Sequence, residues 1–262
     1  MGTKLSKAPV FFALAQVTFD EQLRLDETIA KIQEKFKEAH FPVYKKQQYI
    51  AAIAAPTPAF TGSLTMPDIQ LQSRHMLGTL DQSSIFILER NGLTFTTTRY
   101  EDYDAFATTY FGGLSIVHEI LGLSYVERIG TRYLDAVIPQ EGETIDQYLV
   151  PQVLGTSHLI DKPLQHAISE TVFSEGKMKL VVRTITQNGV LGVPIELGEL
   201  MPRRANFPKI VGLCASIDTD AGAEDRIEFN LDVAKVKLKE LHDEASAAFK
   251  KVVTPLALDR WK

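Results

Sequence analysis

Short stretches of alternating apolar and polar residues, joined to longer stretches with helical spacing, run along the whole chain. Lys7 to Phe19 alternates and is rich in Val, Phe and Ala, which predicts a first strand. Asp26 then caps an apolar stripe with helical spacing, which ends before Pro42. Val43 to Ala54 is again typical of a strand. The chain therefore opens with a strand, a helix and a strand.

The clearest local signal is a β-hairpin over Ser84 to Thr98. Asn91-Gly92 suits the positive φ angles of a type I′ turn. With that two-residue turn, Leu88 is expected opposite Phe95. The hairpin leads into a helix predicted from about Glu101 to Leu121, whose middle is weakened by Gly112-Gly113.

The second half repeats this arrangement. Asn188-Gly189 and Pro194 mark the turn and the end of the last strand in a predicted meander. A further strand and a long helix complete the chain. The predicted meander strands, the further strand and the helix cover residues 166–173, 177–187, 190–195, 209–217 and 231–252.

Hairpins and meanders joined to long amphipathic helices predict an α+β fold with mainly antiparallel sheets. No low-complexity linker divides the sequence. We therefore expect one compact domain over residues 1–262, with two lobes at about 1–140 and 141–262.

Composition narrows the class of protein. The chain has 262 residues, 45% of them hydrophobic, a net charge of -5 and a pI near 5.7, which argues against a dedicated nucleic-acid binder. Cys214 is the only cysteine and lies among apolar residues, so it is interpreted as a small buried residue in a reducing cytoplasm. No apolar run has the length of a membrane span, and no common catalytic or phosphate-binding motif is present. We expect a cytoplasmic protein with no membrane contact and no cofactor.

The segment YVERIGTRYLDAVIP, residues 125–139, combines strand-forming residues with four charges. Strand alternation places Val126, Arg128 and Arg132 on one face, and Tyr133 and Asp135 on the other. These arginines, with Tyr133 and Asp135, are candidate binding residues. Two interpretations stay open: each arginine pairs with an acid of this chain, or it faces a groove and binds an anionic ligand.

Three further features are weaker candidates. Asp218 and Asp220 follow a predicted strand in what reads as a loop, and they are weak candidates for a divalent metal site. Arg203 and Arg204 lie in a short basic loop that could contact an anion. His242 lies beside the apolar stripe of the last helix, which is typical of a boundary histidine that forms a hydrogen bond.

The segment VERIGTRYLDAVIP resembles the central signature, R-[IV]-G-x-R-Y-[LI]-[DN], of an uncharacterised, sporadically distributed bacterial family of about this length. The resemblance extends to APVFFALAQVTFD, LERNGLTFTTTRYEDYDAF and the C-terminal LHDEASAAFKKVVTPLALDRW. It implies a single full-length unit and no established reaction, cofactor or site. Thr131 and Asp135 depart from the residues usual in that family. A patchy distribution is typical of phage-defence and toxin-antitoxin loci, which is an analogy of context.

These features favour a non-catalytic binding protein that recognises a protein or peptide partner, as a sensor, adaptor or neutralising component of such a defence system. A homo-oligomer is compatible with the sequence. The alternative is an enzyme or nucleotide binder that uses Arg128 and Arg132, with a divalent ion at Asp218 and Asp220. A nucleic-acid contact through Arg203 and Arg204 is the weakest of the three hypotheses.

Overall fold

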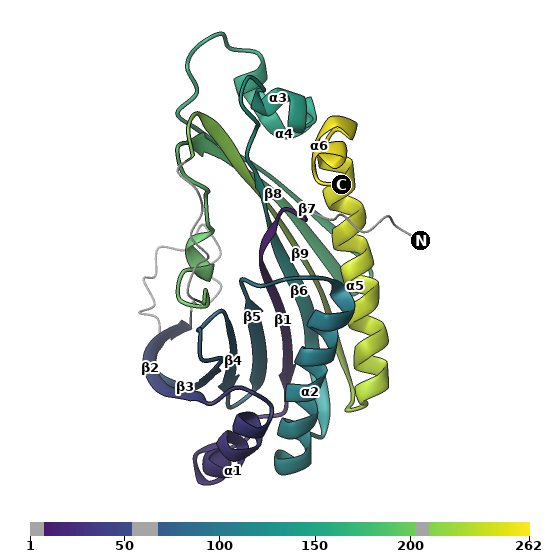
Figure 1. Ribbon diagram of the computed structural model, residues 1–262. Helices are drawn as coiled ribbons and strands as arrows, with labels where there is room; N and C mark the ends of the chain where they lie inside the picture. The colour runs from purple at the N-terminus through teal and green to yellow at the C-terminus, as the bar shows by residue number, and fades with distance from the viewer. Residues whose placement is uncertain (1–7, 54–67, 203–209) are drawn as a thin grey trace.

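The architecture is a single curved sheet of nine strands with its helices on one face, as seen in the computed structural model (Figure 1). The structure describes residues 8–53, 68–202 and 210–262. The α+β prediction is confirmed, and every printed strand pair is antiparallel. None of the helices in the described part is both long enough and apolar enough to cross a bilayer.

The strands follow the order β2-β3-β4-β5-β1-β6-β9-β8-β7 across the sheet. The edge strands are therefore β2 and β7, and β1 pairs with β6 at the centre, where the two halves of the chain meet. The strand bounds are β1 Val10–Phe19, β2 Val43–Ile53, β3 Asp68–Gly78, β4 Ser84–Glu89, β5 Gly92–Thr97, β6 Tyr125–Val137, β7 His166–Glu175, β8 Met178–Asn188 and β9 Leu213–Glu228.

Three long helices cover one face of this sheet, and short helices lie near one end of it (Figure 1). The long helices are α1 Leu25–Glu38, α2 Tyr103–Leu121 and α5 Leu231–Val252. The short ones are α3 Ile145–Tyr148, α4 Pro151–Leu154, η1 Gly155–His158, η2 Ile195–Leu197 and α6 Pro255–Arg260. The predictions of α2 and α5 are confirmed to within two residues.

The ends of the two longest helices follow from their capping residues. The Asp102 side chain accepts a hydrogen bond from the Ala105 backbone N–H at 2.9 Å at the start of α2. Gly122, with φ 67°, ends that helix in the left-handed conformation. Asn230 caps α5 in the same way as Asp102 caps α2. Helix α1 differs from the prediction, because it begins at Leu25 and Asp26 lies in its first turn instead of capping it.

The core between helices and sheet is built around aromatic residues. Phe36, Phe41, Phe86 and Phe95 form edge-to-face and stacked ring contacts with centroids 4.5 to 6.2 Å apart. A side chain at Gly113 would place its Cβ 2.4 Å from the Phe86 ring. The glycine that appeared to weaken α2 therefore lets this helix approach the sheet closely.

The hairpin β4–β5 forms, but its predicted register is wrong. Leu88 lies opposite Leu93, not Phe95, and the turn residues are Arg90 and Asn91. The Asn91 carbonyl accepts a hydrogen bond from the Phe19 backbone N–H at 3.0 Å, so the turn is fixed by the end of β1. A Cβ at Gly92 would lie 3.3 Å from the Val17 carbonyl oxygen. The glycine thus serves close strand packing instead of a positive φ.

Two more predictions are corrected in the second half. Residues 190–195 form no strand, and the partner of β8 is β9 instead. The segment interpreted as a loop around Asp218 and Asp220 is the middle of β9, a 16-residue strand. Strand β3 was not predicted at all. These segments share charged residues within strands, which conceal the alternation that the sequence analysis relied on.

Candidate functional site

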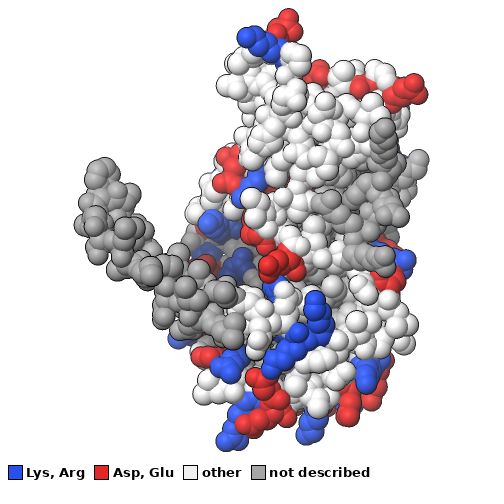
Figure 2. Space-filling model, turned by 90° about the vertical axis from the view of Figure 1, so that its left-hand side faces the viewer, with Lys and Arg blue, Asp and Glu red and all other residues white. Residues whose placement is uncertain are grey.

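The face of the sheet opposite the helices carries four arginines, and we call it the arginine face. They are Arg74 on β3, Arg128 and Arg132 on β6, and Arg183 on β8. Strand register places them on one side, because Arg183 lies opposite Asp218, and Asp218 lies opposite Leu134 in the same alternation as Arg132. Figure 2 views this side of the molecule, where basic side chains gather in a hollow with acidic ones at its margins.

Alternation along β6 differs from the prediction at one residue. A bulge falls between Val126 and Arg128. Val126 consequently packs into the helix-side core with Ile129 and Tyr133, not on the arginine face. From Arg128 to Asp135 the predicted alternation is confirmed, since Leu134 packs on the arginine face and Tyr133 on the helix side.

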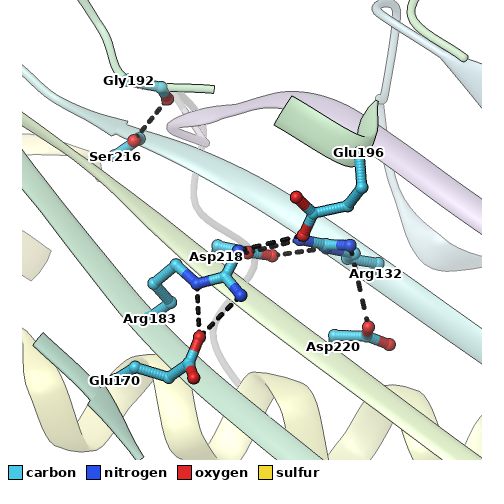
Figure 3. A network of polar contacts seen from close by, with 8 residues as sticks. All are labelled: Arg132, Glu170, Arg183, Gly192, Glu196, Ser216, Asp218 and Asp220. Carbon is cyan, nitrogen blue, oxygen red and sulfur yellow. Dashed lines mark hydrogen bonds and ion pairs between the residues drawn. The ribbon is translucent and has the colours of Figure 1, made fainter. Parts of the chain in front are cut away.

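Arg132 is buried and is bound by acids of its own chain (Figure 3). Its side chain is 10% exposed, and its Nε and Nη2 donate to the two carboxylate oxygens of Asp218, each at 2.7 Å. Nη2 also donates to Glu196 Oε1 at 2.9 Å, and Nη1 lies 3.8 Å from Asp220 Oδ2. Such bidentate geometry is the strongest that an arginine and a carboxylate form.

Arg183 joins the same network from the neighbouring strand. It donates to Glu170 at 2.6 Å, to Glu196 at 3.0 Å and to Asp218 at 3.3 Å. Partial burial works to raise the pKa of Glu196, but hydrogen bonds from Arg132 and Arg183 outweigh it and lower that pKa to about 2. Sequence reasoning missed Arg183, although a charge within its apolar alternating strand was a visible signal.

Asp218 illustrates opposing effects at the centre of the network. Burial raises the pKa of its carboxyl, whereas the guanidinium groups of Arg132 and Arg183 lower it. Burial likewise disfavours the charged form of Arg132, but its hydrogen bonds to Asp218 and Glu196 hold the Arg132 pKa above the ordinary value. Because two guanidinium groups touch the Asp218 carboxylate, the ion pair is the form that this geometry supports.

The acid that bridges Arg132 and Arg183 comes from a segment outside the sheet. Residues 189–202, which we call the strap, cross the arginine face. Leu191 and Leu197 anchor the strap in an apolar cluster with Phe12, Leu14 and Leu134 of the sheet. The Ser216 hydroxyl donates to the strap carbonyl of Gly192 at 2.6 Å (Figure 3).

A second strap carboxylate reaches the outer part of the same face. Glu199 accepts a hydrogen bond from Arg74 Nη2 at 2.8 Å, and Arg74 is buried although the Glu199 side chain is 71% exposed. The Glu196 side chain is also exposed, by 53%. The strap thus presents glutamates from the solvent side to arginines that the sheet buries.

Arg128 differs from the other three arginines. Among the described residues, no acidic side chain forms an ion pair with it, and its Nη1 donates to the amide oxygen of Gln16 at 2.9 Å. Its guanidinium lies flat over two glycines, because a Cβ would come within 3.0 Å of it at Gly130 and 2.8 Å at Gly222. Gln16 is held in turn by a 3.0 Å hydrogen bond from its Nε2 to the Thr94 hydroxyl.

Arg128 also lines an open pocket of about 290 Å³ on the arginine face. Lys177 and Lys179 contribute further positive charge, and Asp220 and Glu224 contribute negative charge. Lys177 is paired with Asp225. The pocket therefore combines an available guanidinium with polar surroundings that can orient a ligand.

The remaining candidate residues fall elsewhere. Tyr133 and Asp135 lie on the helix side of β6, away from the arginines. Arg203 and Arg204 lie outside the described residues. Asp218 and Asp220 do not form a metal site with neighbours, because the described residues contain no group of three or more His, Cys, Asp or Glu side chains placed to hold an ion.

Comparison of the chain with protein-family models, with curated proteins and with solved structures found no match. The resemblance to a bacterial family therefore stays a prediction. The function has to be argued from the geometry of the site alone.

Proposed function

We propose that the protein is a non-catalytic binding protein that holds a carboxylate-bearing segment of a partner protein against Arg128. The observation that carries the proposal is the contrast within the arginine face. Three of its arginines hold carboxylates of this chain, whereas Arg128 holds only an amide oxygen. A guanidinium that is half buried and lacks an acid gains most from a partner carboxylate.

The strap supports this mode of binding by example. Glu196 and Glu199 reach their arginines from a segment that is not part of the sheet, and both glutamates stay largely exposed to solvent. A partner loop that carries Glu or Asp would approach Arg128 from the same side. The glycine floor under Arg128 leaves room for main chain to come close.

The alternative of an enzyme that grips one anion with Arg128 and Arg132 has less support. Arg132 already donates to Asp218 and Glu196, so a ligand would have to displace buried ion pairs. A sensor, adaptor or neutralising role in a bacterial defence system stays a prediction. It specifies the partner no further than a protein with an accessible acidic segment.

The test is recovery of a partner from the native host with three tagged proteins: wild type, Arg128→Gln and Arg24→Gln. Arg24 is a matched control, since it is an arginine on the helix side with a side chain that is 84% exposed. Loss of hydrogen bonds to a charged group costs about 1.5–3 kcal/mol, which corresponds to about tenfold to a hundredfold weaker binding.

We expect one partner to be recovered with wild type and Arg24→Gln, to be depleted with Arg128→Gln, and to be lost as salt rises. Recovery of that partner at equal levels with Arg128→Gln would contradict the proposal. So would recovery of the tagged protein alone at low salt.

A further inference from the structure

A second candidate site lies on the opposite side of the sheet and does not depend on the function proposed for Arg128. It is a cavity of about 350 Å³ between strands β6 and β9, the segment before α2, and helix α5. Asp135 and Thr219 line it from the sheet, and Tyr100, Tyr103 and His242 line it from the segment before α2 and the helices. This volume is at the lower end of the range for small-molecule sites.

Two buried polar groups at the sheet side of the cavity have no partner among the described residues. Asp135 is 3% exposed, and none of those residues donates a hydrogen bond to its carboxyl. The Thr219 hydroxyl is buried and also lacks a hydrogen bond within the described part of the chain. Buried polar groups in folded proteins are nearly always hydrogen-bonded. Two such groups side by side at a cavity therefore indicate a place for a ligand.

Aromatic rings form the walls around these groups. Tyr100 and Tyr133 meet edge to face with centroids 5.5 Å apart, and Tyr103 stacks on His242 at 4.3 Å. The Tyr133 hydroxyl lies 3.0 Å from His242 Nδ1, which fixes both rings. Aromatic faces beside a carboxyl group are the usual environment for an organic ammonium ion.

The charges that surround Asp135 favour a cation over an anion. Lys239 is neutralised by Asp243, to which its Nζ donates at 2.6 Å. Lys250 is then the remaining basic residue at the cavity, against Asp135, Glu101 and Asp102. The titratable groups that face the cavity or act on Asp135 are Tyr100, Glu101, Asp102, Tyr103, Tyr133, Asp218, Lys239, His242, Asp243 and Lys250.

From this arrangement we infer that the cavity binds a small organic ammonium ion, with the cation between the tyrosine rings and opposite the Asp135 carboxylate. The Thr219 hydroxyl is placed to bond a polar group on the same ligand. A neutral molecule of the same shape would keep the apolar contacts and lose the attraction to Asp135 and to the ring faces.

Binding should depend on pH in a defined direction. Burial, to which the nearby Asp218 carboxyl adds, raises the pKa of Asp135 to about 8. The carboxyl is therefore protonated at pH 6.5 and must release its proton when the cation binds. Affinity should rise with pH and level off above the pKa of Asp135, with a gain of about tenfold per pH unit below it at most.

Isothermal titration with choline, at pH 6.5 and 8.5, tests the inference. The matched control ligand is 3,3-dimethylbutanol, which has the shape of choline without its charge. The matched protein variants are Asp135→Asn, which keeps the shape of the side chain, and Arg128→Gln, which changes the other face of the sheet. All four measurements use the full chain.

We expect choline to bind wild type and Arg128→Gln at least about tenfold more tightly at pH 8.5 than at pH 6.5. The alcohol should bind more weakly than choline at pH 8.5, and Asp135→Asn should lose the pH dependence. No binding of choline at millimolar concentration at pH 8.5 would overturn the inference. Equal affinity for choline and the alcohol, or an unchanged affinity of wild type between the two pH values, would overturn it as well, and neither result needs a variant to fold.

Discussion

Arg128 and Arg132 stand four residues apart on β6 and project from the same face of the sheet, yet their surroundings differ completely. Arg132 meets Asp218, Asp220 and Glu196 and is buried by them. Arg128 meets the amide of Gln16 and two glycines and lines an open pocket. The upper part of this face is closed by the strap and its glutamate, whereas the lower part is open.

This difference separates structural roles from binding roles for one residue type. A buried ion pair is strongly needed once it exists, because either partner alone would leave an uncompensated charge in the interior. A guanidinium without an acid contributes little to folding and is free to bind a carboxylate from outside. Each prediction below alters one side of this comparison, in order of decreasing effect on stability.

The largest effect is expected for Arg132→Ala, which leaves Asp218 buried with one weaker arginine contact. We expect a loss of about 3–5 kcal/mol in the free energy of unfolding. Arg128→Ala, its matched control on the same strand, should lose less than about 1.5 kcal/mol, the value of one ordinary hydrogen bond. Urea unfolding of both variants measures the contrast, and equal losses would contradict it.

Asp135 gives the next largest effect, on the opposite face of β6. Its pKa rises from 3.8 to about 8 on folding, so the folded protein binds a proton that the unfolded chain has released. Stability should therefore fall as pH rises towards 8, by at most about 1.4 kcal/mol per pH unit.

The interval from pH 6.5 to 8 isolates this effect. The pKa of His242 is lowered from 6.5 to about 4, mainly by burial, so this histidine is neutral in both states above pH 6.5. Asp135→Asn should be nearly independent of pH in this interval. An Asp135→Asn slope equal to that of wild type in urea unfolding would show that another group is responsible.

A smaller effect is expected for Glu196→Gln, which removes the strap carboxylate that bridges Arg132 and Arg183. Because the Glu196 side chain is half exposed, the loss at pH 7 should stay under about 1 kcal/mol. Glu196 has a lowered pKa, so its contribution is present above its ordinary pKa and is lost as pH falls towards 2. Wild type and variant should therefore differ at pH 7 and converge in acid, and a difference that grows in acid would contradict the ion pairs.

The smallest change in stability is expected for Gly222→Ala. The new Cβ would lie 2.8 Å from Arg128 Nη2 and would push the guanidinium aside. The gain from replacing glycine within a strand opposes this cost, so stability should stay within about 0.5 kcal/mol of wild type. Partner recovery should still fall. Gly112→Ala is the control, because a Cβ there meets nothing within 4 Å, and an equal recovery with both variants would argue against a role for Arg128.

The sequence predicted the elements whose signals are local. Helices α2 and α5 have apolar stripes with capping residues at their starts, so their bounds are confirmed to within two residues. The hairpin register failed because Gly92 answers to the neighbouring strand β1, which is 75 or more residues away in sequence. Strand β9 was taken for a loop since its acids conceal the alternation, and the arginines that neutralise them come from other strands.

The candidate site shows the same limit. Arg128, Arg132, Tyr133 and Asp135 could be singled out from the sequence because charges within a strand need an explanation. Their roles could not be separated, because Asp218 lies 86 residues from Arg132 and Glu196 lies 64 residues from it. Only the folded sheet and the strap decide which arginine meets an acid.

The central claim is that Arg128 is the arginine that binds a partner and Arg132 is the one that holds the fold. The most direct measurement is the affinity of the recovered partner for wild type, Arg128→Gln and Arg24→Gln, with urea unfolding of the same samples. We predict that Arg128→Gln binds at least about tenfold more weakly and unfolds within about 1.5 kcal/mol of wild type. An unchanged affinity in a stably folded Arg128→Gln would contradict the claim.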